Sequence, residues 1–449
     1  MNEKIVLFSS VGEEGFKQMP LPVMSIGSSL HQEGYEVVLI DIQTEDDWRR
    51  KLKDNIRDAL YVGISCMTGP SIFEAIEAAK ITRKLASCTP IVWGGYFASA
   101  FFNKLFDEGL ADYVIRGPGE VASIMLSQYL VSNNELDITQ IPNLTYLIED
   151  QIKSNPFQMI TDMDSLPRMN YDLIDVEQYY YTNVRSQTQR RFYYVSSYGC
   201  PSVCAFCSEK THTHQCWQGF SAERVFNDLV YFDNKYKPDR IQIVDPCFST
   251  NPRRVAKLAQ MMLDNNIRIK MMCDMRIGDV LKIAKLIDLR LLREAGLEKL
   301  YTGIETGSNR VLKALYKNFS KNDALLACEL LDQAGIMSHV SIVHDFPFET
   351  IEDSNETFEL CEQLASLKTN RQFHRIYTPF YGTTLYEELV QNSNLNENFT
   401  LHDWAKTTID GCTNIWSGRK WFRENVLNKV NHLKDRYPTT FKHQPDLQV

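Results

Sequence analysis

The chain has no hydrophobic run long enough to cross a membrane. Its most apolar stretch, Ile91 to Phe102, is well short of the roughly 18 residues that a membrane-spanning helix needs. The first ten residues carry too short an apolar run for a secretion signal, and we expect them to form a strand. The sequence also shows no internal repeat and no low-complexity tract. We therefore expect a globular protein with no membrane partner.

The chain also has no excess of basic residues over acidic ones. The sequence has 48 Lys and Arg against 57 Asp and Glu, which gives a net charge of −9. Proteins that bind a nucleic-acid backbone usually carry a basic surface. We therefore expect no nucleic-acid partner. The eleven cysteines are an odd number without a paired framework, so a secreted disulfide scaffold is not indicated and a reducing cytoplasm is.

The 449 residues predict two or three α/β domains. In residues 1–135, expected strands at 4–9, 35–41, 61–65, 90–93 and 113–115 alternate with expected helices at 22–33, 48–59, 71–85 and 120–130. This alternation is typical of a doubly wound, Rossmann-like (flavodoxin-like) parallel sheet. Ligands of such sheets bind at the carboxyl ends of the strands.

Small residues follow three of these expected strands. They could let the backbone approach a large flat ligand, or each glycine could simply make a turn between strand and helix. The candidate residues are Ser65 and Thr68 after the third strand, Gly94 and Gly95 after the fourth, and Gly117 and Gly119 after the fifth.

The remaining chain divides into three regions. Residues 136–190 contain three prolines and are expected to form a linker with a small hairpin near Leu144. Residues 191–386 return to alternating strands and helices, among them an expected strand at 267–273 and a single expected helix at 280–295. This alternation predicts a partial (β/α)6 barrel with its chemistry at the strand ends. Residues 387–449 are polar and are expected to form a small, mostly helical region.

Three cysteines, Cys200, Cys204 and Cys207, occupy one short loop with C-x3-C-x2-C spacing. An apolar, β-prone run at 192–195 leads into this loop. Thiolates are soft metal ligands, and iron–sulfur clusters usually take four of them, so three would leave one iron open to a small ligand. A zinc site is the alternative; it would use Cys204, Cys207, His212, His214 and Cys216.

This triplet, with the aromatic Phe206 before its third cysteine, resembles the cluster loop of the radical SAM superfamily. The resemblance implies a [4Fe–4S] cluster that reductively cleaves S-adenosylmethionine (SAM) to a 5′-deoxyadenosyl radical. It also implies a small-molecule substrate and an external electron donor of the flavodoxin or ferredoxin type. Later segments resemble the SAM-contacting motifs of the same superfamily, and the cofactor-binding residues implied are Phe206, Asp245, Ser249, Arg276, Glu305 and Val343.

Each of these residues also has a structural alternative. Asp245 could cap a helix, Arg276 could make a surface salt bridge, and Glu305 could be a carboxylate at the edge of the core. His344 stands where relatives have a glycine, so it could be a substrate-facing acid or base or simply a structural histidine. In the C-terminal region, Cys412 could donate a hydrogen atom or be a buried thiol.

Residues 4–130 resemble the cobalamin-binding domain that precedes many radical SAM cores. The resemblance rests on the three small-residue turns, and it implies cobalamin as a further cofactor. Two departures stand out. The D-x-H-x-x-G signature is absent, since residues 9–15 read Ser-Ser-Val-Gly-Glu-Glu-Gly, and Tyr96-Phe97 replaces the Pro-His that often follows the paired glycines.

Residues 4–130 and about 191–386 together thus resemble the class B radical SAM methyltransferases. This likeness implies cobalamin-dependent methylation of an unactivated carbon in a small-molecule or natural-product intermediate. The alternative is a radical SAM epimerase, dehydratase or cyclase whose N-terminal domain lacks cobalamin or does not use it. A tRNA-modifying methylthiotransferase would bring further cluster cysteines and a basic RNA module, and we discount it.

Overall fold

The computed structural model describes residues 3–10, 17–132, 136–182, 188–392, 395, 398–407 and 418–441. The chain forms two compact units. The N-terminal unit comprises residues 1–193, 208–218 and 399–407, and the barrel unit comprises 194–207, 219–398 and 408–449. This division is based on how the residues pack. It does not test the bounds of the four regions expected from the sequence, which remain predictions.

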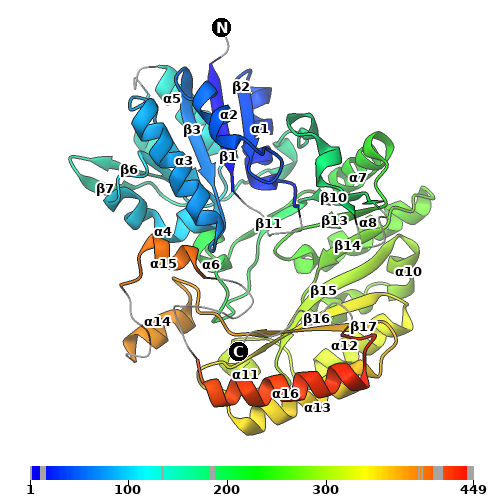
Figure 1. Ribbon diagram of the computed structural model, residues 1–449. Helices are drawn as coiled ribbons and strands as arrows, with labels where there is room; N and C mark the ends of the chain where they lie inside the picture. The colour runs from blue at the N-terminus through cyan, green and yellow to red at the C-terminus, as the bar shows by residue number, and fades with distance from the viewer. Residues whose placement is uncertain are drawn as a thin grey trace. The chain divides into compact units, whose positions relative to one another are not determined.

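The N-terminal unit contains a seven-stranded sheet in the order β2-β1-β3-β4-β5-β6-β7 (Figure 1). The first five strands pair in parallel, which is the predicted doubly wound arrangement. The predicted hairpin extends this sheet as an antiparallel pair. The strands are β1 (Lys4–Ser9), β2 (Glu36–Asp41), β3 (Ala59–Ser65), β4 (Ile91–Gly94), β5 (Tyr113–Ile115), β6 (Leu144–Ile148) and β7 (Gln151–Ser154).

Helices cover this sheet because its strands are apolar on both faces: Ile5, Val6 and Phe8 of β1 are fully buried. The helix at 95–107 was not predicted, since the apolar stretch from Ile91 hides the break at Gly94 and Gly95. The helices are α1 (Leu21–Gln32), α2 (Trp48–Asn55), α3 (Ser71–Leu85), α4 (Gly95–Asp107), α5 (Glu120–Val131), α6 (Glu209–Thr213) and α15 (Leu401–Ala405).

The expected linker is tied to the N-terminal unit by two tyrosines. The Tyr179 hydroxyl donates to the buried Asp41 carboxylate (2.6 Å), and the Tyr171 hydroxyl donates to the carbonyl of Tyr193 (2.5 Å). The short elements here are η1 (Ile138–Gln140), η2 (Met163–Ser165), η3 (Tyr171–Leu173), η4 (Val176–Tyr179), β8 (Tyr181–Thr182) and β9 (Thr188–Gln189).

A six-stranded sheet in the order β10-β13-β14-β15-β16-β17 forms the barrel core, as predicted, with parallel pairing from β13 to β17. Its strands are β10 (Arg191–Tyr194), β13 (Arg240–Ile243), β14 (Met271–Asp274), β15 (Leu297–Glu305), β16 (Met337–His344) and β17 (Asn370–Ile376). The remaining short strands are β11 (Ser197–Gly199) and β12 (Trp217–Gly219).

The barrel helices follow their strands in the predicted order, with two corrections. The single helix predicted at 280–295 is two helices, α9 and α10, and the strand before it starts at Met271 rather than 267. The helices are α7 (Ala222–Tyr236), η5 (Phe248–Thr250), α8 (Pro252–Asp264), α9 (Ile277–Ala284), α10 (Leu289–Glu294), α11 (Asn309–Ala314), α12 (Lys321–Gln333), α13 (Ile351–Ala365), α14 (Thr384–Gln391) and α16 (Lys420–Arg436).

The barrel sheet has two unlike faces. Side chains that are fully buried, such as Leu300 and Ile304 of β15, alternate with partly exposed ones such as Tyr301. We call the first set the helix face and the second set the open face. Within the described ranges, no helix is long and apolar enough to cross a membrane.

Candidate functional site

The loop of three cysteines lies at the start of the barrel unit. All three lie outside any disulfide and are partly exposed. The Cys207 amide donates to the Cys204 carbonyl (3.2 Å), and the Ala205 amide donates to the carbonyl of Leu315 (3.2 Å), which anchors the loop to the barrel. Three thiols in one anchored turn suit a soft-ligand metal group.

Cys200 belongs to a polar group at the carboxyl ends of β13 and β14. A hydrogen bond to the Cys247 side chain lowers the pKa of Cys200 to about 6, which favours the thiolate that a metal ligand must supply. The Arg276 guanidinium donates to the Ser202 hydroxyl (2.7 Å) and to Asp279 (2.6 Å). Because Asp279 is 2% exposed, this ion pair is not the surface salt bridge considered as the alternative for Arg276.

The Asp245 carboxylate is fully engaged within the protein. It accepts hydrogen bonds from the Ser196 amide, the Ser196 hydroxyl and the Ser197 hydroxyl, each at 2.6 Å. Arg254 adds a cation 3.5 Å away. The capping alternative is wrong, because Asn251 caps α8. Asp245 therefore holds the ends of β10 and β13 together and has little capacity left for a ligand.

Ser249 has a similar supporting position. Its hydroxyl donates to Asp279 (3.2 Å) and accepts from the Arg276 amide (3.1 Å). The side chain is fully buried. Ser249 thus fixes where the Arg276 backbone and its acidic partner lie.

Asp274, which the sequence analysis did not select, ends β14 on the open face. It pairs in register with Tyr301, and its carboxylate accepts no hydrogen bond from any described residue. Burial and the nearby Asp245 carboxylate raise the pKa of Asp274 to about 7. On the neighbouring strand, the Gln242 side-chain oxygen is also buried without a partner among described residues. Two acceptors that lack donors on one face suit a cationic or donor-rich ligand group.

Glu305 forms a buried ion pair with Lys317, a second residue that the sequence analysis missed. The Lys317 ammonium donates to the Glu305 carboxylate (2.9 Å) and to the Gly303 carbonyl (3.1 Å). It also lies 5.4 Å from the centre of the Phe206 ring. Glu305 has a left-handed backbone (φ 71°), which is uncommon outside glycine and often marks functional sites.

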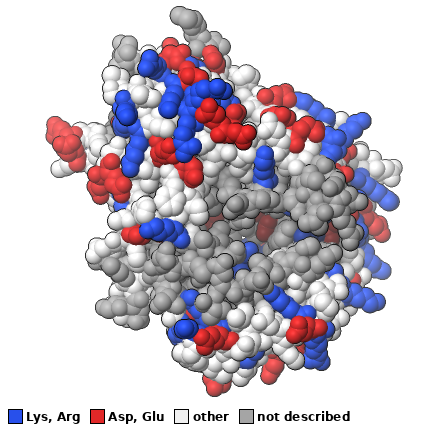
Figure 2. Space-filling view, viewed as in Figure 1, with Lys and Arg blue, Asp and Glu red and all other residues white. Residues whose placement is uncertain are grey.

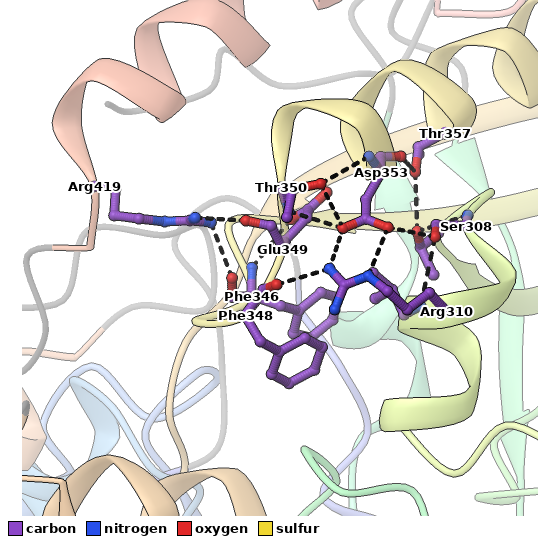
Figure 3. Close-up of polar contacts among 11 residues, drawn as sticks. Ser308, Arg310, Phe346, Phe348, Glu349, Thr350, Asp353, Thr357 and Arg419 are labelled. Carbon is purple, nitrogen blue, oxygen red and sulfur yellow. Dashed lines mark hydrogen bonds and ion pairs between the residues drawn. The ribbon is translucent and has the colours of Figure 1, made fainter.

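The turn between β16 and α13 is held by a network of hydrogen bonds that includes an ion pair (Figure 3). Asp353 accepts from Ser308 (2.6 Å) and forms an ion pair with Arg310, which joins this turn to the end of β15. Arg419 donates to the carbonyls of Glu349 (2.6 Å) and Phe346 (2.9 Å). Val343, which we predicted to contact SAM, is partly exposed next to this rigid turn.

His344 points the other way, onto the helix face. It is fully buried, stacks on Phe358 of α13, and its Nε2 lies 2.8 Å from His374 Nδ1. Burial lowers the pKa of His344 to about 3, so the ring is neutral. This placement favours the structural role over a substrate-facing acid or base.

In the N-terminal unit, the six small residues come together at one sheet edge, because β3, β4 and β5 are adjacent parallel strands. Gly117 (φ +104°) has no room for a side chain: a Cβ there would lie 2.7 Å from the Phe157 ring. Gly95 (φ +87°) would place a Cβ 3.0 Å from the Ser65 hydroxyl. A Gly119 Cβ would lie 2.9 Å from Ile26, while Thr68 is partly exposed. At Gly95, Gly117 and Gly119 the protein's own atoms occupy the Cβ position, so these turns are tightly packed. They lie at the edge where ligands of such sheets bind.

The zinc alternative is not supported by its histidines. The His212 ring is stacked on Tyr96 (centroids 4.2 Å apart) with Nδ1 at Ser99, and His214 packs on Phe157. Across the described ranges, no three His, Cys, Asp or Glu side chains are grouped closely enough to hold a metal ion as they stand. Cys412 and most of residues 9–15 lie outside the described residues.

Two protein-family models match the chain. The B12 binding domain matches residues 11–126, and the radical SAM superfamily matches residues 194–361. These domains define the class: a radical SAM enzyme that carries a B12-binding domain. The chain carries both domains of this class, as the sequence resemblance predicted, and the cofactors of these domains are a [4Fe–4S] cluster, SAM and cobalamin.

Several curated proteins are similar over most of the chain. An uncharacterised methyltransferase of Pyrococcus horikoshii is 27% identical over 95% of this chain and 90% of its own length. The hopanoid C-3 methylase of Methylococcus capsulatus is 26% identical (81% and 67%). The anaerobic magnesium-protoporphyrin IX monomethyl ester cyclase of Synechocystis is 24% identical (82% and 72%).

Solved structures share the fold. The radical SAM methyltransferase TsrM from Kitasatospora setae, with cobalamin and a [4Fe–4S] cluster bound, superimposes with a TM-score of 0.72. It is 17% identical, and the match covers 89% of this chain and 81% of TsrM. OxsB, a cobalamin-dependent SAM radical enzyme, gives a TM-score of 0.70 at 17% identity, over 96% of this chain and 62% of its own.

Proposed function

We propose that this protein is a cobalamin-dependent radical SAM methyltransferase that methylates an unactivated carbon of a small molecule. The main support is the presence of a B12-binding domain and a radical SAM domain on one chain. The names of two similar proteins, a methyltransferase and a hopanoid methylase, point the same way.

We assign Cys200, Cys204 and Cys207 as the cluster ligands. The chemistry supplied by a [4Fe–4S] cluster is the reductive cleavage of SAM to a 5′-deoxyadenosyl radical. The loop holds three sulfurs and leaves one iron without a protein ligand. Lys317 supports the site electrostatically, because the charges of Cys204 and Cys207 act on its ammonium.

We assign SAM recognition to side chains at the strand ends of the barrel. Asp274 is placed to accept from the SAM ammonium, in place of Asp245, whose oxygens are already satisfied within the fold. Arg276 is placed to bind the SAM carboxylate, and Glu305 to bind the ribose hydroxyls. Ser249 and Asp245 act as positioning residues, and Phe206 and Val343 as apolar walls.

We assign the N-terminal turns to cobalamin, which carries the methyl group in this class of reaction. The backbone at Gly94, Gly95, Gly117 and Gly119 allows close approach, because there is no Cβ at these four positions. The Ser65 and Thr68 hydroxyls follow β3 at the same edge and can donate hydrogen bonds to polar groups of the ligand. Together these residues orient the ligand and restrict water at the sheet edge.

The products of SAM separate the proposal from its alternative. Methyl transfer uses one SAM as methyl donor and a second as radical source. Anaerobic incubation with SAM, a reductant and substrate-containing extract should therefore yield both S-adenosylhomocysteine and 5′-deoxyadenosine, the former only when cobalamin is present. An epimerase, dehydratase or cyclase, as the cyclase relative suggests, would form 5′-deoxyadenosine without S-adenosylhomocysteine and so contradict the proposal.

We also propose the partners that this chemistry requires. Reductive cleavage needs one electron, which a flavodoxin- or ferredoxin-type donor can deliver. Lys and Arg are interspersed with Asp and Glu on the face shown in Figure 2, which supports a small-molecule substrate over nucleic acid. The cysteines described all lie outside any disulfide, which supports a reducing, cytoplasmic location.

A further inference from the structure

A short helix, α6, begins two residues after Cys207 and packs on α4 of the N-terminal unit. The Tyr96 hydroxyl donates to the Glu209 carboxylate (2.7 Å). The Tyr96 ring stacks on His212 with centroids 4.2 Å apart. The segment that directly follows the cluster loop is therefore anchored to the helix that starts at the Gly94-Gly95 turn.

Ser99 connects the same helix to the second glycine turn. Its hydroxyl donates to the Gly95 carbonyl (2.8 Å) and accepts from the Gly117 amide (3.2 Å). Because that hydroxyl hydrogen is already used, the contact with His212 Nδ1 (3.0 Å) requires Nδ1 to carry the proton and donate. The His212 carbonyl also lies 3.1 Å from the position of a Gly117 Cβ.

Tyr96 makes both of the side-chain contacts that join it to α6, through its hydroxyl to Glu209 and through its ring to His212. Glu209 is buried and also accepts from the Thr213 hydroxyl (2.9 Å), so its carboxylate is held in place for Tyr96.

We infer that Tyr96, Ser99, Glu209 and His212, which we call the α4–α6 contact, couple occupancy of the cobalamin site to occupancy of the cluster loop. The inference rests on the proposed function. These four are positioning residues, since they touch the glycine turns and the segment after Cys207 rather than a reacting atom. When a cluster fixes the conformation of the loop, it also fixes α6, and through α6 the two glycine turns. By linkage, bound cobalamin must stabilise cluster binding by the same free energy.

The test compares hydroxocobalamin affinity for cluster-free and anaerobically reconstituted full-length protein. Dissociation constants are measured by quenching of tryptophan fluorescence, with iron and sulfide assayed on each sample. The wild type should bind hydroxocobalamin about fivefold or more tightly when the cluster is present, the lower end of typical coupling. In Tyr96→Phe, which removes only the hydroxyl, this ratio should fall toward one while the iron content is retained.

Two further variants keep the test decisive. Ser99→Ala removes the link to Gly117 without touching Tyr96, and it should also lower the ratio. Tyr129→Phe removes a hydroxyl from α5, away from α6, and should keep the wild-type ratio and melting curve. A ratio of one in the wild type, or an unchanged ratio in both contact variants, overturns the inference. Failure of the wild type to bind hydroxocobalamin at all would also overturn the cobalamin-dependent function.

Discussion

The candidate site of the N-terminal unit is formed mainly by backbone, whereas that of the barrel unit is formed mainly by charged side chains. In the N-terminal unit the edge at β3, β4 and β5 is shaped by backbone, with Gly95 and Gly117 in left-handed conformations. In the barrel unit the strand ends carry charged side chains, such as the Glu305–Lys317 pair. A large planar ligand needs room and close backbone approach, whereas a cluster and a charged sulfonium need thiolates and compensating charge. Each site should therefore be lost through a different kind of change, with only the modest mutual effect that the α4–α6 contact transmits.

The largest effect should come from the cluster loop. Cys204→Ala removes one of only three sulfur ligands, so reconstituted protein should lose most of its iron and sulfide and all 5′-deoxyadenosine formation. Hydroxocobalamin binding should persist with weaker affinity. Cys328→Ala, at a buried cysteine on α12, is the matched control and should keep its iron. Full iron content in Cys204→Ala would contradict the assignment.

Lys317→Met should produce the next largest effect. It leaves the Glu305 carboxylate buried without its cation, a change that typically costs about 3–5 kcal/mol when a buried pair loses one partner. The free energy of unfolding should fall by a similar amount. SAM affinity, measured by equilibrium dialysis on reconstituted folded protein, should fall by about tenfold or more, because Lys317 no longer orients Glu305. Lys317→Arg should retain most of the wild-type SAM affinity. Unchanged SAM affinity in Lys317→Met would show that the pair is only structural.

Gly117→Ala tests the backbone side of the comparison. The added Cβ meets the Phe157 ring and also strains a left-handed backbone (φ +104°), at a cost of about 1–3 kcal/mol. Hydroxocobalamin affinity should fall by about tenfold or more, while iron content and SAM affinity stay at wild-type levels. Gly278→Ala, where the nearest atom is 4.0 Å away, should change neither. If Gly117→Ala lost SAM affinity as strongly as hydroxocobalamin affinity, the proposed difference between the two sites would be wrong.

Asp274→Asn tests the acid that we propose binds the SAM ammonium. Charge-assisted hydrogen bonds contribute about 1.5–3 kcal/mol, so SAM affinity should fall about tenfold or more. A SAM analogue without the α-amino group should bind the variant and the wild type equally. If the analogue loses as much affinity as SAM, Asp274 does not recognise the ammonium.

Glu349→Gln should have the smallest effect on cofactor binding, and its effect should be visible in the pH dependence of stability. Burial raises the pKa of Glu349 to about 8, against about 4.3 when unfolded. The native state therefore holds the proton more tightly, and this contribution to stability is lost as pH rises from about 4 to about 8. Relative to wild type, the variant's free energy of unfolding in urea should improve between pH 5 and pH 8. If the difference in the free energy of unfolding between variant and wild type stays constant from pH 5 to pH 8, the prediction is wrong.

The succession of strands and helices along the chain could be predicted, and with it the doubly wound sheet and the partial barrel. The reason is that buried parallel strands are apolar and helices separate them. Helix α4 could not be predicted, since Ile91 to Phe102 is apolar across both a strand and a helix. The break becomes visible only at Gly95, whose left-handed backbone ends the strand. The two short helices α9 and α10 were merged for a similar reason, because their apolar spacing continues across the break.

Side-chain partners were the least predictable part of the site. Asp245 was identified as an acid at a strand end, but Ser196, Ser197 and Arg254 satisfy it, and two of these are remote in sequence. Lys317 comes twelve residues after Glu305, beyond the motif. The signal that could have found Asp274 is its place at a strand end, directly before the Met275-Arg276 segment.

The most direct test of the central claim is a cofactor count on one anaerobically reconstituted sample. Iron, sulfide and cobalamin are measured together per chain. The account predicts about four irons and four sulfides with one cobalamin, bound at the same time. Iron and sulfide without cobalamin would contradict the methyltransferase, and zinc in place of iron would contradict the radical SAM assignment as a whole.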